Sequence, residues 1–229
     1  MWFLKKIFSK ILGTPKKDDN CLRNFTQNIY WGNSLTPHQA RKNLEEGILE
    51  LVDLDGNHSS NGLLLTDDGY FITSAHCLIG SHALRVILKD QSYRITEVCS
   101  LDARNDIGLA KINSNGNSTS RVYKFFNPDN FSLLQAIPIV VLTKQSGCLI
   151  LKGGYTCGLK IDKLTTIQKV NLYDQIELNI TVRQGDSGGV VSTSNYEIVG
   201  IVNTATISVS SGHASQWHKA LELIVSYKP

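Results

Sequence analysis

Short apolar runs separated by turn residues make up most of the chain from residue 47 onward. Asp67-Asp68-Gly69 lies between two of these runs and is a typical hairpin signal. Many short strands at a spacing of roughly 8–12 residues favour a β-sandwich or β-barrel over alternating strands and helices. The body of the chain is therefore predicted to be all-β, with strands at residues 48–52, 63–66, 70–73, 84–88, 107–112, 137–142, 149–151, 176–182, 190–192 and 198–202.

A polar stretch divides this body into two β-rich parts. Residues 113–120 read Asn-Ser-Asn-Gly-Asn-Ser-Thr-Ser, which is typical of a loop, and they separate residues 47–120 from residues 131–212. Near the end of the chain the apolar spacing changes to that of a helix. We expect this C-terminal helix over residues 214–227, with one apolar face formed by Trp217, Leu221, Ile224 and Val225.

The first 46 residues have a different pattern and are predicted to be a helical extension of a main domain at residues 47–229. In residues 1–12, apolar side chains fall on one half of a helix and lysines mainly on the other, which is typical of a helix lying on a membrane interface. Packing of this helix on its own domain or on a partner explains the pattern equally well. Thr36-Pro37 predicts the start of a second helix, which continues to Glu46.

The charge of the chain is unevenly distributed. The 229 residues carry a net charge of +3. Residues 1–17 contain five lysines and no acidic residue, or +5, so the remaining residues carry −2. A basic leader can bind an anionic membrane surface or a partner, whereas the weakly acidic body argues against a nucleic-acid partner. A hydrophobic fraction of 41% excludes a disordered chain.

Five cysteines, at positions 21, 77, 99, 148 and 157, show no metal-ligand spacing. The odd number is unlike a secreted disulfide scaffold. Pairing of Cys148 with Cys157 across a hairpin stays open at this stage. We interpret the set mainly as reduced thiols and expect a cytoplasmic protein, peripheral at a membrane if residues 1–17 bind there.

No metal, phosphate or nucleotide motif is present, so we expect no metal site and no cofactor.

Three short motifs carry residue types used in nucleophilic catalysis. In chain order they are Thr-Ser-Ala-His-Cys at 73–77, Asp-Ile-Gly-Leu-Ala at 106–110 and Gln-Gly-Asp-Ser-Gly-Gly at 184–189. The last is the most specific, because a serine nucleophile requires a tight turn whose amide groups converge, and glycine permits that backbone path.

These motifs resemble those of trypsin-like serine peptidases, and the segments 62–79 and 200–205 are most similar to bacterial peptidases of the HtrA (Deg) type. The resemblance covers about residues 47–212, and no PDZ module is expected within the chain. It implies two antiparallel six-stranded β-barrels with the active site between them, corresponding to residues 47–120 and 131–212.

The resemblance also implies the roles of three side chains. His76 is the expected general base, Asp106 the carboxylate that orients it, and Ser187 the nucleophile. A serine hydroxyl needs a neutral imidazole to take its proton, and the imidazole needs a carboxylate on its other nitrogen; this is the established triad template. Asp102 is the rival for the carboxylate, but it lacks the strand pattern that follows Asp106.

The same resemblance predicts an oxyanion hole and a substrate pocket. The backbone N–H groups of Gly185 and Ser187 are the expected oxyanion donors. The predicted pocket residues are Thr181, Gln184, Asn203, Thr204 and Ala205. Thr181 at the pocket floor offers no charge to a basic side chain, and Val202 stands where glutamate-specific relatives keep a histidine. We therefore expect small or medium aliphatic substrate side chains at P1.

Asp186 departs from the pattern of the HtrA type, which usually has asparagine there. In digestive relatives this aspartate pairs with an amino group freed by cleavage, and the matching activation sequence is absent upstream of residue 47. A buried carboxylate needs a partner. We predict that an internal lysine or arginine, or a set of hydrogen bonds, supplies it.

The sequence thus predicts an endopeptidase that cleaves a protein or peptide substrate through an acyl-enzyme. A catalytically silent peptide-binding module on the same fold is the alternative, and an esterase-like hydrolase is a third. The complete set of a serine, a histidine and an acid argues against the binding module, because holding a peptide requires no nucleophile. The oligomeric state stays open.

Overall fold

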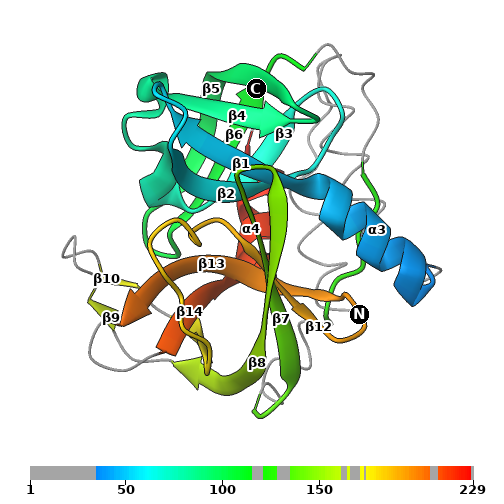
Figure 1. The fold of residues 1–229 in the computed structure, drawn as a ribbon. Coiled ribbons are helices and arrows are strands. Elements are labelled where there is room, and N and C mark those ends of the chain that lie inside the picture. The colour runs from blue at the N-terminus through cyan, green and yellow to red at the C-terminus, as the bar shows by residue number, and fades with distance from the viewer. Residues whose placement is uncertain are drawn as a thin grey trace.

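The computed structural model describes residues 35–114, 121–127, 135–160, 164–165, 171–172, 174–206 and 211–227. In these residues the chain forms two closed antiparallel barrels of six strands each, which lie one above the other in Figure 1. The predicted all-β class and the two six-stranded barrels are confirmed.

Barrel one is built from the first six strands. These are β1 (Ile48–Asp53), β2 (His58–Leu64), β3 (Tyr70–Thr73), β4 (Leu84–Leu88), β5 (Gln91–Asp102) and β6 (Ile107–Ile112). They pair in the order β1-β2-β3-β6-β5-β4. Leu49 and Leu51 of β1 point into its core together with Phe71 and Val86, and none of the four is exposed. Because side chains alternate along a strand, Ile48 and Glu50 lie on the other face of β1.

Barrel two is built from the later strands. These are β7 (Pro138–Gln145), β8 (Cys148–Lys160), β11 (Gln175–Leu178), β12 (Val190–Thr193), β13 (Ile198–Thr206) and β14 (Ser211–Gln216). They pair in the order β11-β14-β13-β12-β7-β8. The strands β9 (Leu164–Thr165) and β10 (Asn171–Leu172) form a separate pair. The long β7–β8 hairpin reaches from barrel two to β1 of barrel one (Figure 1).

The helix α3 (Pro37–Gly47) leads into β1 and begins where the sequence predicts. The side chain of Thr36 accepts a hydrogen bond from the Gln39 N–H, the side chain of Gln39 accepts one from the Thr36 N–H, and Pro37 occupies the first turn. The predicted membrane-binding or partner-binding helix and Cys21 lie outside the described residues, so those expectations stay predictions. No helix in the described ranges is long and apolar enough to cross a membrane.

The C-terminal helix α4 (Trp217–Ser226) begins three residues later than the predicted residue 214. Ala214 and Ser215 instead belong to β14, where they pair with Ile176 of β11 and Ile201 of β13 and close barrel two. The helix then packs against β5 and β6 of barrel one as well as β13 and β14 of barrel two. It lies between the two barrels in Figure 1, and its buried face fills part of the space between them.

Candidate active site

The pairing of β3 with β6 brings His76 and Asp106 together across 30 residues of sequence. Thr73, the last residue of β3, pairs with Gly108 near the start of antiparallel β6. Residues just after β3 therefore lie beside residues just before β6. His76 is on the short 3₁₀ helix η2 (Ala75–Leu78), and the Ala75 N–H donates to the Asp106 carbonyl at 3.1 Å.

Both oxygens of the Asp106 carboxylate bind His76. Oδ2 lies 2.7 Å from His76 Nδ1, and Oδ1 accepts the His76 backbone N–H at 2.9 Å. The Asp106 residue is 7% exposed and has a φ of 52°, which places it in the left-handed region. A residue other than glycine in this region is uncommon and often marks a functional site. The imidazole is thus fixed at one nitrogen, leaving Nε2 for another partner.

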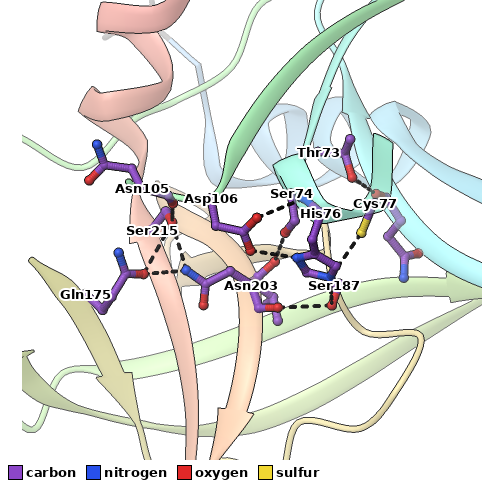
Figure 2. A network of polar contacts seen from close by, with 12 residues as sticks. Thr73, Ser74, His76, Cys77, Asn105, Asp106, Gln175, Ser187, Asn203 and Ser215 are labelled. Carbon is purple, nitrogen blue, oxygen red and sulfur yellow. Dashed lines mark hydrogen bonds and ion pairs between the residues drawn. The ribbon is translucent and has the colours of Figure 1, made fainter. Parts of the chain in front are cut away.

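That partner is Ser187, which enters from barrel two. Its Oγ lies 3.2 Å from His76 Nε2 and 3.1 Å from the Asn203 carbonyl oxygen (Figure 2). The carbonyl of Val202 ties the two barrels together here: it accepts the Gly188 N–H at 2.7 Å and the Ser74 hydroxyl at 2.7 Å. The three residues predicted as a triad therefore meet where the two barrels join.

The rival carboxylate, Asp102, has a different place. Its Oδ1 accepts the N–H groups of Arg104 and Asn105 at 3.0 and 3.1 Å, and its Oδ2 accepts the Asn105 side chain at 2.6 Å. Asp102 therefore stabilises the turn that precedes Asp106, and its carboxylate does not contact His76.

The surroundings of His76 raise its affinity for a proton. Burial lowers the pKa, but the hydrogen bond with Asp106 and the neighbouring Cys77 raise it, and the pKa is raised to about 10. The Cys77 sulfur lies 3.5 Å from the same Nε2 that faces Ser187. Sequence motifs alone do not reveal this third contact, because a thiol next to histidine in sequence need not face its ring.

The turn before Ser187 presents two N–H groups. Gly185 has a φ of 95°, and a Cβ there would lie 2.7 Å from Cδ2 of His58, so both conformation and space require glycine. Gly188 has a φ of 78°, and a Cβ there would overlap the Asn61 carbonyl oxygen. Within the described part of the chain, the Gly185 and Ser187 N–H groups have no hydrogen-bond acceptor. Both are predicted oxyanion donors.

Lys152 of β8 is the partner of Asp186, which confirms the predicted internal cation. Its Nζ binds Oδ2 of Asp186, and the same oxygen accepts the Arg183 N–H at 2.6 Å. The side chains of Lys152 and Asp186 are 24% and 11% exposed. The carboxylate in the turn of the predicted nucleophile is thus neutralised from within the folded chain.

The predicted pocket residues divide into three groups. Thr181 and Gln184 are exposed beside the turn of Ser187. Asn203 is 1% exposed and turns its side chain inward, so that only its carbonyl faces Ser187. The side chains of Thr204 and Ala205 lie outside what the structure describes, although both residues belong to β13.

The inward side chain of Asn203 belongs to a polar network that the sequence did not indicate. Its Nδ2 binds Gln175 Oε1 and lies 2.8 Å from Ser215 Oγ, which in turn binds the Asn105 carbonyl (Figure 2). This network links barrel two to the residue that precedes Asp106. It therefore supports the loop that carries the carboxylate, and no local motif marks its members.

Comparison with known proteins finds the same kind of domain. A family model described as a trypsin-like peptidase domain matches residues 60–201. The probable periplasmic serine endoprotease DegP-like of Brucella suis is 29% identical over 152 residues, covering 66% of this chain and 28% of that protein. Its namesake from Bartonella henselae is 25% identical over 213 residues, covering 93% of this chain and 39% of that protein. The chain thus spans well under half the length of these curated relatives.

Solved structures show the same fold. The active form of the Rv3671c protease from M. tuberculosis has a TM-score of 0.68 at 18% identity, covering 86% of this chain and 88% of that one. An inactive form of the same protease has a TM-score of 0.63 at 18% identity, covering 86% and 96%. The resemblance to HtrA-type peptidases seen in the motifs is confirmed by the sequence relatives.

The expected cytoplasmic location is wrong by the same comparison, because these relatives are named periplasmic endoproteases. The prediction depended on cysteine usage. Cys77, Cys99, Cys148 and Cys157 are all free thiols, so Cys148 and Cys157 do not pair. A fold with two large apolar cores needs no disulfide in any compartment, so reduced thiols do not identify the location.

Proposed function

This chain belongs to the trypsin-like peptidase domain family, and on that premise we propose that it is a serine endopeptidase that cleaves protein substrates through an acyl-enzyme. The observation that carries the proposal is the continuous contact from Asp106 through His76 to Ser187, at 2.7 and 3.2 Å. We assign the peptidase domain to residues 47–229.

In the proposed reaction, His76 Nε2 takes the proton of Ser187 as Oγ attacks the carbonyl carbon of the scissile peptide bond. Asp106 keeps the Nδ1 proton of the imidazole in place and stabilises the imidazolium that forms. The N–H groups of Gly185 and Ser187 bind the oxyanion of the tetrahedral intermediate. His76 then gives its proton to the leaving amine, and water releases the acyl group by the same steps.

A fluorophosphonate probe tests whether Ser187 is activated. We expect the 229-residue chain with an uncleaved N-terminus to be labelled on Ser187, as located by mass spectrometry of the digested adduct. Heat-unfolded protein and Ser187→Ala are the controls and should stay unlabelled. Absence of labelling in the folded parent would favour the silent peptide-binding module, and turnover of esters without turnover of peptides would favour the esterase.

We further propose that the primary pocket prefers small or medium aliphatic side chains. The exposed Thr181 is neutral, and Val202 is fully buried, so neither supports a charged substrate group. In peptides that differ only at P1, alanine, valine and leucine should give kcat/KM values about tenfold above those for arginine or glutamate. Equal or higher values for either charged residue would contradict this preference.

Cys77 should influence the pH dependence of the reaction. His76 must be neutral to accept a proton, so the labelling rate falls as the pH drops below its pKa. Because contact with Cys77 helps to raise that pKa, Cys77→Ala should lower it and shift the acidic limb of the rate profile to lower pH. Cys157→Ala, at an exposed thiol of β8, is the control and should leave the limb in place. A limb that stays or moves to higher pH in Cys77→Ala would refute the effect.

A further inference from the structure

A second carboxylate–imidazole pair lies buried where β1 and β2 of barrel one face barrel two. Glu50 Oε1 of β1 is 3.0 Å from His58 Nδ1 of β2, and the two side chains are 4% and 10% exposed. A buried ionic pair is costly unless every polar atom finds a partner. The remaining polar atoms of these two side chains bind backbone groups of two turns in barrel two.

Glu50 binds the turn of the β7–β8 hairpin. Its Oε1 accepts the Ser146 N–H at 2.7 Å, and its Oε2 accepts the Gly147 N–H at 3.0 Å. Both turn residues have positive φ angles, of 50° and 76°. With two backbone N–H groups directed at it, the carboxylate acts as an acceptor, so the imidazole donates to it from Nδ1.

The other nitrogen of His58 binds the turn of the predicted nucleophile. Nε2 lies 2.8 Å from the Gly185 carbonyl oxygen, which can only accept a hydrogen bond. The ring therefore joins the Glu50 carboxylate to the Gly185 carbonyl. Through Glu50 and His58, the β7–β8 turn is thus connected to the Gly185 carbonyl by hydrogen bonds.

Asn61 of β2 holds the same turn at two points. Its Nδ2 donates to the Gly185 carbonyl at 2.7 Å, and its backbone N–H donates to the Ser187 carbonyl at 2.7 Å. Its Oδ1 accepts the Lys144 N–H at 2.6 Å, which fixes the orientation of the amide. Asn61 is fully buried, so water does not compete for these bonds.

The peptide group between Gly185 and Asp186 is consequently held from both ends. His58 and Asn61 bind its carbonyl oxygen, and its N–H donates to the Arg183 carbonyl at 3.0 Å. The two predicted oxyanion donors, the N–H groups of Gly185 and Ser187, belong to the peptide groups immediately before and after it. Rotation of the held peptide would turn both donors away from a common point.

We propose that Glu50, His58 and Asn61 are positioning residues of the reaction, which orient the oxyanion donors of barrel two from barrel one. This proposal rests on the proposed function. The residues touch no reacting atom and act through the Gly185 carbonyl. Loss of one oxyanion donor lowers turnover by about 10²–10³-fold. A donor that is only misoriented should lower turnover by a smaller factor that is still measurable.

Two substitutions of similar size at His58 test the proposal. In His58→Gln the side-chain amide can still donate to the Gly185 carbonyl, whereas in His58→Met it cannot, and both remove the contact with Glu50. We expect the fluorophosphonate labelling rate of folded His58→Met to fall at least about tenfold below that of His58→Gln. Equal rates in the two folded variants would overturn the proposal, because a purely structural role predicts equal effects on chemistry.

Asn61→Asp provides a second test if the His58 variants do not fold. It keeps the acceptor for Lys144 but presents a carboxylate oxygen to the Gly185 carbonyl. Asn43→Asp is the matched control, because Asn43 Nδ2 also donates to a backbone carbonyl, that of Val122 at 2.9 Å, on α3 away from the site. We expect a fall of at least about tenfold in kcat with little change in KM for Asn61→Asp only.

The outcomes separate the two proposals. An unlabelled parent protein defeats the proposed function. A labelled parent with equal kcat values for the Asn61→Asp and Asn43→Asp variants, both folded by circular dichroism at the assay temperature, defeats the positioning role alone.

Discussion

Ser187→Ala is expected to lower peptide turnover by about 10⁶-fold, because the three side chains act as one unit. Without the Oγ, His76 has no proton to accept and no acyl-enzyme forms. His76→Ala should lose a similar factor, since an unassisted hydroxyl is a very weak nucleophile. The double variant should be no less active than either single variant. Steady-state hydrolysis of one peptide substrate by all three variants measures this.

Ser192→Ala is the matched control for this experiment. Ser192 lies in β12, five residues after Ser187, and its fully buried Oγ has no hydrogen-bond partner among the described residues. The same substitution there should leave turnover within about twofold of the parent, since removing a hydroxyl that has no hydrogen-bond partner breaks no contact with the site. A loss of only tenfold in Ser187→Ala, or a double variant far below both single variants, would contradict the assigned mechanism.

Lys152→Met is expected to lower both stability and turnover by a large factor. The substitution leaves the Asp186 carboxylate with the Arg183 N–H but without a cation. Because the pair is mostly but not fully buried, we expect a loss of about 2–3 kcal/mol in the free energy of unfolding. The turn carrying Gly185 and Ser187 loses its fixed position as well, so turnover should fall by about 10²–10³-fold. Urea unfolding and steady-state kinetics measure the two effects.

Adding Asp186→Asn to Lys152→Met should recover part of the stability, because the uncompensated buried charge is then removed. Lys124→Met is the control, since Lys124 forms a comparable ion pair with Glu197 at 2.8 Å away from the site. It should cost at most about 1 kcal/mol and leave turnover unchanged. An equal cost in Lys152→Met and Lys124→Met would show that Lys152 is an ordinary surface ion pair.

The sequence predicted the features that short motifs specify. The turn containing Ser187 was predictable because Gly185 and Gly188 adopt positive φ angles, a local backbone conformation that favours glycine. His76 and Asp106 were predictable because the motifs around them resemble those of trypsin-like serine peptidases, whereas the strand pattern alone does not show that β3 pairs with β6. The start of α3 was predictable because Thr36 and Pro37 act within the first turn of the helix.

The supporting residues were not predictable, because their partners are far away along the chain. Glu50 sits in an apolar strand and meets a turn 96 residues later. Lys152 follows three apolar residues in β8 and precedes two glycines, a pattern that names no partner, and its partner lies 34 residues away. Asn203 was expected to line a pocket, but its side chain is turned inward by Gln175 and Ser215. The strand pattern assigns a face to each residue and leaves its partner undetermined.

Close packing at Gly188 restricts the design of chimaeras between this protein and a relative. There the main chain of barrel two touches the main chain of barrel one so closely that no methyl group fits. A chimaera joined between the barrels must reproduce that fit to within a few tenths of an ångström. Engineers seeking altered selectivity should therefore exchange single exposed side chains such as those of Thr181 and Gln184, and keep both barrels from the same parent.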